Sequence, residues 1–447
     1  MTSMTNVVVA GGDADAAIAR IEKLTPAGYA GLAVSNGLDV FEYVVNRQPD
    51  LVLFEGAFSD VDAFEVVRKL KRSIDTLHIP AIMLNADTTP EMLQEGLESG
   101  LGDMIARDTP TDIVTARLQP FVRLATMHAE CIRRVATAES FHIPVDLMGI
   151  HNVDTAGCRV LLVGAESAGV DRVSDNLRDQ DISVSRESSQ FAAGERLAAE
   201  TFDAAIIVAE APAEVEKAYF LCAHIRNNSR LFNLPVLLAS NSGLVPASDL
   251  PYRQGASIAV ALDGNPDNLA ISLKFLVLRQ RLRWNLHAPL TATLTERTAD
   301  SLRGLYSGSF LRSHMARQLD WTGRRRRSLS LAVFSIQNLD SAESMYGAGA
   351  GGQLMQQAAN WVSSLIRIED MAARLAPIEI CAVFPDTEEQ DARQAADRIA
   401  GVLHHSEFTL TGSRNATTRM WTQSGVATSV PGDSVEDLVA RARDNLA

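Results

Sequence analysis

The stretch QPDLVLF, residues 48–54, returns later in the chain as TFDAAIIV, residues 201–208, and this repetition determines the predicted fold. VVVA at residues 7–10 returns at the same spacing as VLLV at residues 160–163. Self-similarity at a fixed period is the signature of repeated structural units. The first two thirds of the chain are therefore predicted to contain two copies of one unit.

The pattern inside each copy indicates its architecture. Short apolar runs, such as HIPAIML at 78–84 and its counterpart NLPVLLA at 233–239, alternate with amphipathic segments such as AFEVVRKLKR at 63–72. Continuous apolar runs are typical of parallel strands that are covered on both faces, and the amphipathic segments supply the covering helices. Each copy is thus predicted to be a doubly wound α/β domain with a parallel, flavodoxin-like sheet.

Two longer helical segments, residues 116–136 and 269–284, follow the two copies. The second of them is equally compatible with a dimerisation helix and with a helix packed on its own domain. A third domain of different pattern begins near residue 295. We predict four segments: a first domain with an extended helix at 1–140, a linker at 141–156, a second domain with a signalling helix at 157–286, and a third domain at 295–447.

Composition excludes several classes of protein. Of the 447 residues, 46% are apolar and 21% charged, which is typical of globular domains. The chain has no apolar run of about 18 residues, so we expect no membrane insertion and a cytoplasmic location. The net charge of −14 would repel nucleic acid and acidic lipid, so we expect neither as a partner. Only the run at residues 324–327, RRRR, is densely basic, either as a solvated loop or as an aid to binding an anion.

The four cysteines do not indicate a cofactor. Cys131, Cys158, Cys222 and Cys381 are far apart and lack the spacing of a metal site or a disulfide framework. We therefore expect reduced thiols and no bound metal.

The first copy resembles the receiver domain of response regulators at PDLVLFE, HIPAIML and ESGLGD. Receivers hold Mg²⁺ with an acidic pair and phosphorylate an aspartate, because a cation must offset the charge of the phosphoryl oxygens. The resemblance places Gly11 and Gly12 at the acidic pair, Glu55 at the phosphoacceptor, Asn85 at the switch hydroxyl and Arg107 at the lysine. It therefore implies that this copy is not phosphorylated in the ordinary way.

Two interpretations of Glu55 remain open: a permanent imitation of the phosphorylated state, or a relic. The second copy is further from the receiver pattern. The resemblance places Gly164 and Ala165 at its acidic pair, and Val208 and Ala209 at its acceptor. It implies an adaptor or docking domain.

The third domain resembles a GGDEF diguanylate cyclase domain. The resemblance is carried by an ordered series of motifs: ADSLRGLYSGSFL near residue 300, IRIEDMAARL at 366–375, Ala-Pro-Ile-Glu-Ile at 376–380, and QSGVATS at 423–429. Together with the two upstream copies, the chain resembles two-component signalling proteins that combine two receivers with a GGDEF domain, and especially their non-catalytic members.

The family's catalytic residues are replaced in this sequence. A cyclase of this family holds two Mg²⁺ ions with a strand aspartate and a turn acid, and the resemblance places Ser335 and Ile378 there. The two turn glycines correspond to Ala376 and Pro377, and proline lacks an N–H. Only Glu379 survives from the turn.

The guanine-reading positions are replaced as well, by Glu343 and Gly352. We therefore expect a pseudoenzyme, with a residual cyclase or a GTP-binding regulator as the alternative.

A second site of the family is retained. The resemblance implies an inhibitory cyclic di-GMP site with an RxxD motif five residues before the turn, and Arg367 and Asp370 have that spacing. A further arginine of that site corresponds to Arg398, and Arg178, near the expected helix of the second copy, is a candidate fourth member. Arginine can bind guanine O6 and N7 with two hydrogen bonds, and aspartate can accept from the N–H edge of guanine.

The leading hypothesis is a non-catalytic cyclic di-GMP effector. Resemblance to non-catalytic family members implies a homodimer at a cell pole that acts as a protease adaptor in the cell cycle. The implied partners are the mediator RcdA, the regulator CtrA and the protease ClpXP. A polar scaffold that binds no nucleotide is the third hypothesis.

Overall fold

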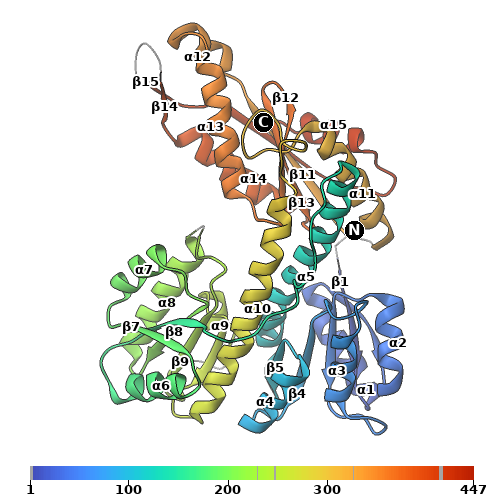
Figure 1. Cartoon of the computed structure of the whole chain (residues 1–447), viewed down its shortest axis with the longest axis vertical. Coiled ribbons are helices and arrows are strands. Elements are labelled where there is room, and N and C mark those ends of the chain that lie inside the picture. The colour runs from blue at the N-terminus through green and yellow to red at the C-terminus, as the bar shows by residue number, and fades with distance from the viewer. Residues whose placement is uncertain (1–3, 229, 246–247, 326, 412–415) are drawn as a thin grey trace. The chain divides into compact units, whose positions relative to one another are not determined.

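The structure, a computed structural model, describes residues 4–228, 230–245, 248–325, 327–411 and 416–447 (Figure 1). Contacts divide the chain into two compact units. The paired unit contains Thr5–Ala125 and Gly149–Asn285, and the C-terminal unit contains Met1–Met4, Thr126–Met148 and Leu286–Ala447.

The first copy is a five-stranded parallel sheet of order β2-β1-β3-β4-β5. Helices cover both faces, and the central strand β3 is buried along its whole length, as its uninterrupted apolar run predicts. The elements are β1 Thr5–Ala10, α1 Ala14–Leu24, the 3₁₀ helix Thr25–Ala27, β2 Tyr29–Val34, α2 Gly37–Arg47, β3 Leu51–Glu55, α3 Ala63–Arg72, β4 Ala81–Ala86, α4 Pro90–Ser99 and β5 Asp103–Ala106.

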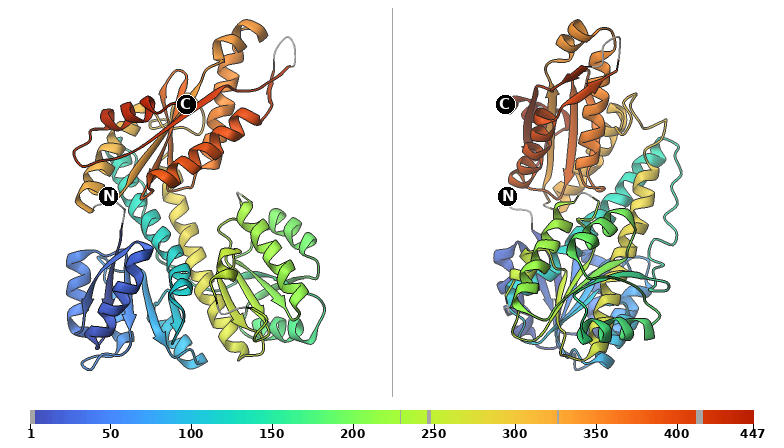
Figure 2. Two further views of the ribbon diagram at one scale, coloured as in Figure 1. Left: turned by 180° about the vertical axis from the view of Figure 1, so that it is seen from behind. Right: turned by 90° about the vertical axis from the view of Figure 1, so that its left-hand side faces the viewer.

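The second copy has the same topology, β7-β6-β8-β9-β10, and is also parallel throughout. Figure 2 shows both sheets with helices on each side. The elements are β6 Arg159–Val163, α6 Ala168–Asp179, β7 Ser183–Glu187, α7 Gln190–Ala199, β8 Ala204–Ala209, α8 Pro212–Asn227, β9 Val236–Ser240, α9 Leu250–Arg253 and β10 Ile258–Ala261.

The repeat extends to individual hydrogen bonds. Before β3, the carboxylate of Asp50 accepts from the N–H of Asn6 at 2.7 Å, and before β8 the carboxylate of Asp203 accepts from the N–H of Arg159 at 2.8 Å. Equivalent aspartates thus join equivalent strand ends in both copies.

Each copy also uses a partly buried cation to hold the loop before its fourth strand. In the first copy, Nζ of Lys71 donates to the carbonyls of Leu77 and Ile79, and burial lowers the pKa of this ammonium to about 8. In the second copy, Nη1 of Arg226 donates to the carbonyls of Phe232 and Leu234. Lysine and arginine differ chemically, but here both satisfy two loop carbonyls.

Two long helices follow the copies: α5, Thr111–Ser140, and α10, Pro266–Ala292. Apolar residues of α10 are buried in two cores of the paired unit. Leu273 and Val277 pack in the core of the second copy, whereas Ile271 and Phe275 pack in the core of the first. These α10 side chains are thus buried within the chain.

The C-terminal unit is built on an antiparallel sheet of order β12-β13-β11-β16, with a separate β14-β15 ribbon. Strand β11 is buried on both faces: Phe334 and its alternate neighbours face one core, and Val333 and its alternate neighbours face another. The elements are α11 Gly308–Arg325, β11 Leu329–Ile336, α12 Leu339–Tyr346, α13 Ala350–Leu365, β12 Met371–Ala376, β13 Glu379–Pro385, α14 Glu389–His405, β14 Phe408–Leu410, β15 Ala416–Thr418, β16 Thr422–Thr428 and α15 Val435–Asp444.

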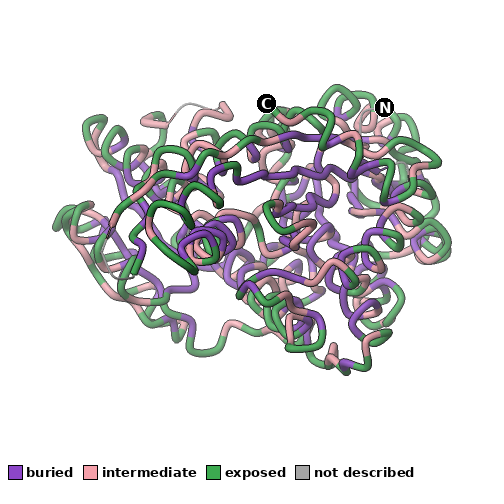
Figure 3. Tube along the Cα trace, turned by 90° about the horizontal axis from the view of Figure 1, so that it is seen from above, coloured by how far each residue is buried: buried purple, intermediate pink, exposed green. Residues whose placement is uncertain are grey.

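The last part of α5 belongs to one of these two cores. Ala138 and the following Ile143 pack with residues of α11, β11 and α15. Figure 3 shows the buried segments with exposed segments around them. In the described ranges, no helix combines the length and apolar character needed to cross a membrane.

Candidate functional site

The RxxD motif forms a closed turn between α13 and β12. The N–H of Arg367 donates to Oδ2 of Asp370 at 2.8 Å, and the N–H of Asp370 donates to the carbonyl of Arg367 at 3.1 Å. Asp370 is 5% exposed, whereas the Arg367 side chain is exposed and its guanidinium makes no hydrogen bond within the described part of the chain. The turn therefore holds the carboxylate of Asp370 in a buried position and leaves the guanidinium of Arg367 exposed to solvent.

Arg398, on α14, lies beside the same turn. Its Nη2 donates to the carbonyl of Leu365, two residues before Arg367, at 3.1 Å. Arg398 is exposed. The structure therefore brings Arg367, Asp370 and Arg398 to one place, with two cations next to a buried carboxylate.

Burial, and secondly the neighbouring Glu369 carboxylate, raise the pKa of Asp370 to about 7, although Arg367 acts in the opposite direction. Its Oδ1 has no hydrogen-bond partner among the described residues. A buried acceptor without a donor costs free energy, so an N–H group brought by a ligand would be favourable there.

Sequence reasoning missed a residue beneath the turn. Arg134, on α5, is 2% exposed, and its guanidinium donates to the carbonyls of Ile368, Glu369 and Asp370. These contacts join residues more than 200 positions apart, so no local motif could have shown them.

Arg178 lies on α6 in the paired unit. Its side chain is 53% exposed and lies 3.6 Å from Asp175, one helical turn away. It is thus not part of the C-terminal unit that contains the RxxD turn.

The resemblance assigns the two metal-binding positions of a cyclase to Ser335 and Ile378. Ser335 is 2% exposed and its Oγ accepts from Nε2 of Gln337, while Ile378 is an aliphatic side chain that is partly exposed. A neutral hydroxyl and an aliphatic side chain do not fit Mg²⁺, which prefers carboxylate oxygens. No step can therefore be assigned to a metal at these two positions.

Two acidic residues near these positions are used structurally. The carboxylate of Glu343 accepts from the N–H groups of Gly349 and Gly351 at the start of α13, which lowers its pKa. The carboxylate of Glu379 accepts from Nε of Arg443 at 2.9 Å. Both carboxylates therefore already have hydrogen-bond donors within the protein.

In the first copy, the phosphoacceptor position is occupied by an ion pair. Glu55 is buried and accepts from Nε and Nη2 of Arg20 at 2.9 and 3.0 Å, and from the side-chain amide of Asn85. A Cβ atom at Gly11 would lie 2.1 Å from the carbonyl oxygen of Glu55, and one at Gly12 would lie 2.6 Å from that of Ala57. An acidic pair therefore has no room here, and the residues do not fit a receiver's Mg²⁺.

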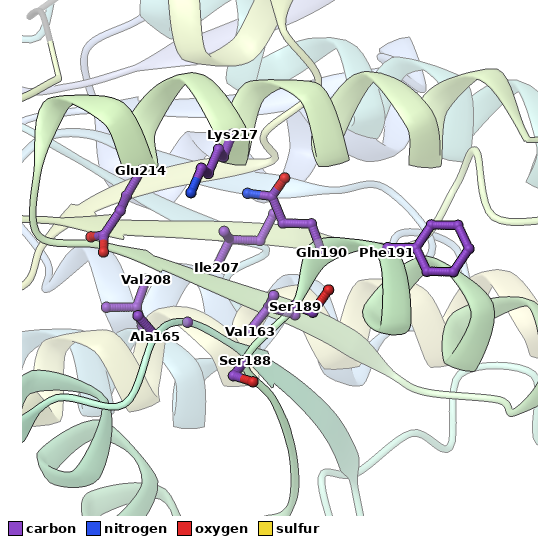
Figure 4. A pocket seen from close by; sticks show the side chains of 11 residues that line it. Val163, Ala165, Ser188, Ser189, Gln190, Phe191, Ile207, Val208, Glu214 and Lys217 are labelled. Carbon is purple, nitrogen blue, oxygen red and sulfur yellow. The ribbon is translucent and has the colours of Figure 1, made fainter.

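The second copy has a pocket of about 460 Å³ at the carboxyl ends of its strands, where an α/β sheet usually binds ligands (Figure 4). Its walls are mostly small or apolar, with Lys217 as the cation and Phe191 at the rim. Gly164, Ala165 and Val208 line it, so it holds no carboxylate at the acceptor position.

The basic run begins in the last turn of α11 and is not simply a solvated loop. Arg324 pairs with Asp320, while Arg327 is buried beside Asp386. Arg326 lies outside the described residues. No group of three or more metal-ligating side chains occurs among the described residues.

The fold and the comparisons agree on the class: the chain combines receiver-type domains with a C-terminal GGDEF domain, which confirms the predicted fold class. Residues 297–447 match the family described as diguanylate cyclase, GGDEF domain. Over 436 residues the chain is 24% identical to the response regulator PleD of Caulobacter vibrioides, which covers 95% of this chain and 92% of PleD.

Two further similarities are more limited. The phosphate regulon regulator PhoB of Pseudomonas aeruginosa is 34% identical over 100 residues, covering 22% of this chain and 44% of PhoB. Among solved structures, the GGDEF domain of DgcB from Caulobacter crescentus, in complex with c-di-GMP, is 20% identical with a TM-score of 0.32, covering 34% of this chain and 86% of that chain.

Proposed function

We propose that the protein is a non-catalytic receptor for cyclic di-GMP that binds the dinucleotide at Arg367, Asp370 and Arg398. The observation that supports this most strongly is the arrangement of these three residues around one closed turn. A dinucleotide carries two phosphates and two guanine edges, and the turn offers two exposed cations and one acceptor without a donor.

Each side chain has a distinct role in this proposal. Arg367 hydrogen-bonds to the O6 and N7 acceptors of a guanine, or neutralises a phosphate. Asp370 accepts from the N–H edge of the same base through its unpaired Oδ1. Arg398 adds positive charge beside the turn, where its guanidinium donates to the carbonyl of Leu365.

The chemistry at the catalytic positions supports a receptor rather than a cyclase. Ser335 and Ile378 supply no carboxylate for a metal, and Glu343 is already bonded to the start of α13. Triphosphate chemistry depends on metal ions that neutralise the developing charge. We therefore propose that the GGDEF domain reads the nucleotide and does not make it.

We further propose an output through protein partners. The chain resembles PopA, a non-catalytic paralogue of PleD, and this resemblance supports a polar adaptor that brings CtrA to ClpXP through RcdA. This part of the proposal rests on the resemblance. Pull-downs of the purified full chain with RcdA, with and without cyclic di-GMP, test it.

The binding proposal is tested by isothermal titration of the full chain with cyclic di-GMP, and with GTP as a control ligand. We expect micromolar or tighter binding of cyclic di-GMP by the wild type and a loss of at least about a hundredfold in Arg367→Gly, because a buried or bidentate charged contact contributes about 3 kcal/mol. Arg393→Ala is the matched control, since Arg393 lies on α14 but pairs with Glu389.

Three outcomes are distinguishable. Binding that Arg367→Gly abolishes and Arg393→Ala preserves supports the receptor. A wild type that binds no cyclic di-GMP contradicts it and favours a nucleotide-independent scaffold. Turnover of GTP with Mg²⁺ or Mn²⁺ would instead favour a residual cyclase.

A further inference from the structure

The backbone of the RxxD turn is held by a side chain from a helix that starts in the first receiver-type domain. Nη2 of Arg134 donates to the carbonyls of Glu369 at 2.6 Å and Asp370 at 3.0 Å, and Nη1 donates to that of Ile368 at 3.2 Å. Three consecutive carbonyls of the turn therefore face one guanidinium. The planar geometry of that group restricts their directions, which a flexible ammonium could not do equally well.

Arg134 is itself fixed by a buried cluster. Its Nε donates to Oε1 of Glu130 at 3.0 Å, and Glu130 is fully buried. Two side chains of α11 hold the same carboxylate: Nε2 of His314 lies 2.7 Å from Oε1, and Nε2 of Gln318 donates to Oε2 at 2.9 Å. Burying a charge is costly unless it is paired and hydrogen-bonded. Both oxygens of the Glu130 carboxylate have partners, so the cluster has one strongly preferred geometry.

The buried cluster joins the end of α5 to α11. Helix α5 begins at Thr111, five residues after strand β5 of the first receiver-type domain ends at Ala106, and continues to Ser140. Glu130 and Arg134 lie near its end, in the C-terminal unit. The helix that touches the turn therefore begins within the segment Thr5–Ala125 of the paired unit and continues as one helix into the C-terminal unit.

We propose that Arg134 is a positioning residue for the cyclic di-GMP site, and that occupancy of the RxxD turn is coupled through it to the last part of α5. This inference rests on the proposed receptor function and adds the element that responds to the ligand. A ligand that draws Arg367 and Asp370 onto a guanine acts on the same four-residue turn whose carbonyls Arg134 holds. Such coupling is reciprocal. If the ligand shifts the conformational equilibrium of α5 by a given factor, a shift of α5 between the same two conformations changes the affinity for cyclic di-GMP by that factor.

The test combines one variant, one control and one measurement on the wild type, all in the full chain. Arg134→Lys keeps the charge but loses the fork that reaches three carbonyls. Arg133→Lys is the control, because Arg133 lies on the same helix and within 3.4 Å of Glu130, but stacks on Trp321 and makes no described contact to the turn. Affinity is measured by titration with cyclic di-GMP, and folding by thermal unfolding.

We expect Arg134→Lys to lose about tenfold or more in affinity, and Arg133→Lys to stay within about twofold. Hydrogen exchange supplies a readout that a merely structural role would not change. In the wild type, cyclic di-GMP should slow exchange of amides 130–138 as well as 367–371. In Arg134→Lys, the turn should exchange faster without ligand, and protection of 130–138 by ligand should be lost.

Failure of this inference and failure of the proposed function give different results. If the wild type binds but its α5 amides exchange at the same rate with and without ligand, the coupling is wrong while the receptor stands. This measurement needs no variant, so it holds even if Arg134→Lys does not fold. If the wild type does not bind, the receptor is wrong, and unchanged ligand-free exchange of 367–371 in the variant would overturn the positioning role as well.

Discussion

Asp370 is the residue at which burial and charge are in conflict. It is almost fully buried next to another carboxylate, Glu369, yet it accepts a hydrogen bond from the N–H of Arg367 that closes the turn. The nearby guanidinium of Arg134 is already directed at three carbonyls and at Glu130. The ionised form of Asp370 is therefore poorly compensated without ligand, which explains why burial dominates its pKa.

A pH dependence follows from this raised pKa. The ordinary pKa of an aspartate is about 3.9 and that of folded Asp370 is about 7, so between these values the folded state binds more protons than the unfolded chain. The stability contributed by Asp370 is present at low pH and is lost as pH rises toward 7. Compared with Asp370→Asn, the wild type should lose stability in urea unfolding between pH 5 and about 7.5.

The prediction concerns the difference in stability between the wild type and Asp370→Asn, because other groups titrate in the same pH range. His314 is buried with a lowered pKa, so its contribution to stability is lost as pH falls, which is the opposite direction. It is present in both proteins and cancels. A difference between wild type and Asp370→Asn that does not change with pH would contradict the assignment.

Glu55 poses a second residue-scale question, because it occupies the phosphoacceptor position as half of an ion pair. Arg20 and Glu55 are 10% and 5% exposed at their side chains, and two hydrogen bonds join them. The guanidinium thus supplies the positive charge that a metal ion supplies in receivers. This arrangement makes Glu55 a structural residue in the first copy, whichever conformational state it favours.

A double-mutant cycle measures the interaction energy between Arg20 and Glu55. Arg20→Met should destabilise the protein by about 3 to 5 kcal/mol, because it leaves a buried carboxylate with Asn85 as its remaining partner. Adding Glu55→Gln should recover part of the loss, with a coupling energy of about 1 to 3 kcal/mol in urea unfolding. Strictly additive effects would show that the pair is not energetically important.

At the scale of elements, the strands were predictable and the helix partners were not. Apolar runs such as VVVA and LVLF are buried on both sides wherever they occur, so the pattern predicts the strands, and the repeat predicts that both sheets share one order. Helix α5 is longer than predicted, 111–140 against 116–136, and it continues through Pro120.

The missed contact at Arg134 has a specific physical reason. Glu130 and Arg134 are four residues apart, a spacing that normally indicates an ion pair on a solvent-exposed helix face. Both are buried here, because α11 supplies His314 and Gln318 to complete the cluster. Burial of a polar helix face depends on the partner helix, and a single sequence carries no signal of it.

The RxxD residues were predictable for the opposite reason. Arg367 and Asp370 interact with each other, so their spacing in sequence already contains the geometry of the turn. Arg398 was found through the resemblance, and the structure places it at Leu365. Contacts within four residues can be read from sequence, whereas contacts across the fold need a family pattern or a structure.

At the scale of the whole molecule, contacts cross the boundaries that sequence repeats indicate. The repeat places residues 126–148 at the end of the first copy and in the linker, but their contacts belong to the unit of Leu286–Ala447. Thr137 contacts His314, Arg134 holds the RxxD turn, and Ile143 is part of a core that contains β11 and α15. The GGDEF domain in this chain is therefore completed by a segment from far upstream.

A fragment of residues 286–447 should consequently be incomplete. Without α5, His314 and Gln318 lose the carboxylate that they contact, and the apolar residues packed on Ala138 and Ile143 become exposed. We expect the fragment to unfold at a clearly lower temperature than the same residues in the full chain, because each lost buried contact of this kind costs about 1 to 3 kcal/mol. A synthetic peptide of residues 126–148 should bind the fragment and raise its unfolding temperature.

The same peptide with Glu130→Gln and Arg134→Met is the control, since it keeps Ala138 and Ile143 but lacks the two charges. If it stabilises the fragment as well as the native peptide, apolar packing alone explains the association and the buried cluster is not a determinant of it. If neither peptide binds and the fragment is as stable as the full chain, the upstream segment is not part of the domain. Selective rescue by the native peptide would show that the receiver's helix completes the GGDEF domain through a charged, buried contact, because only that contact differs between the two peptides.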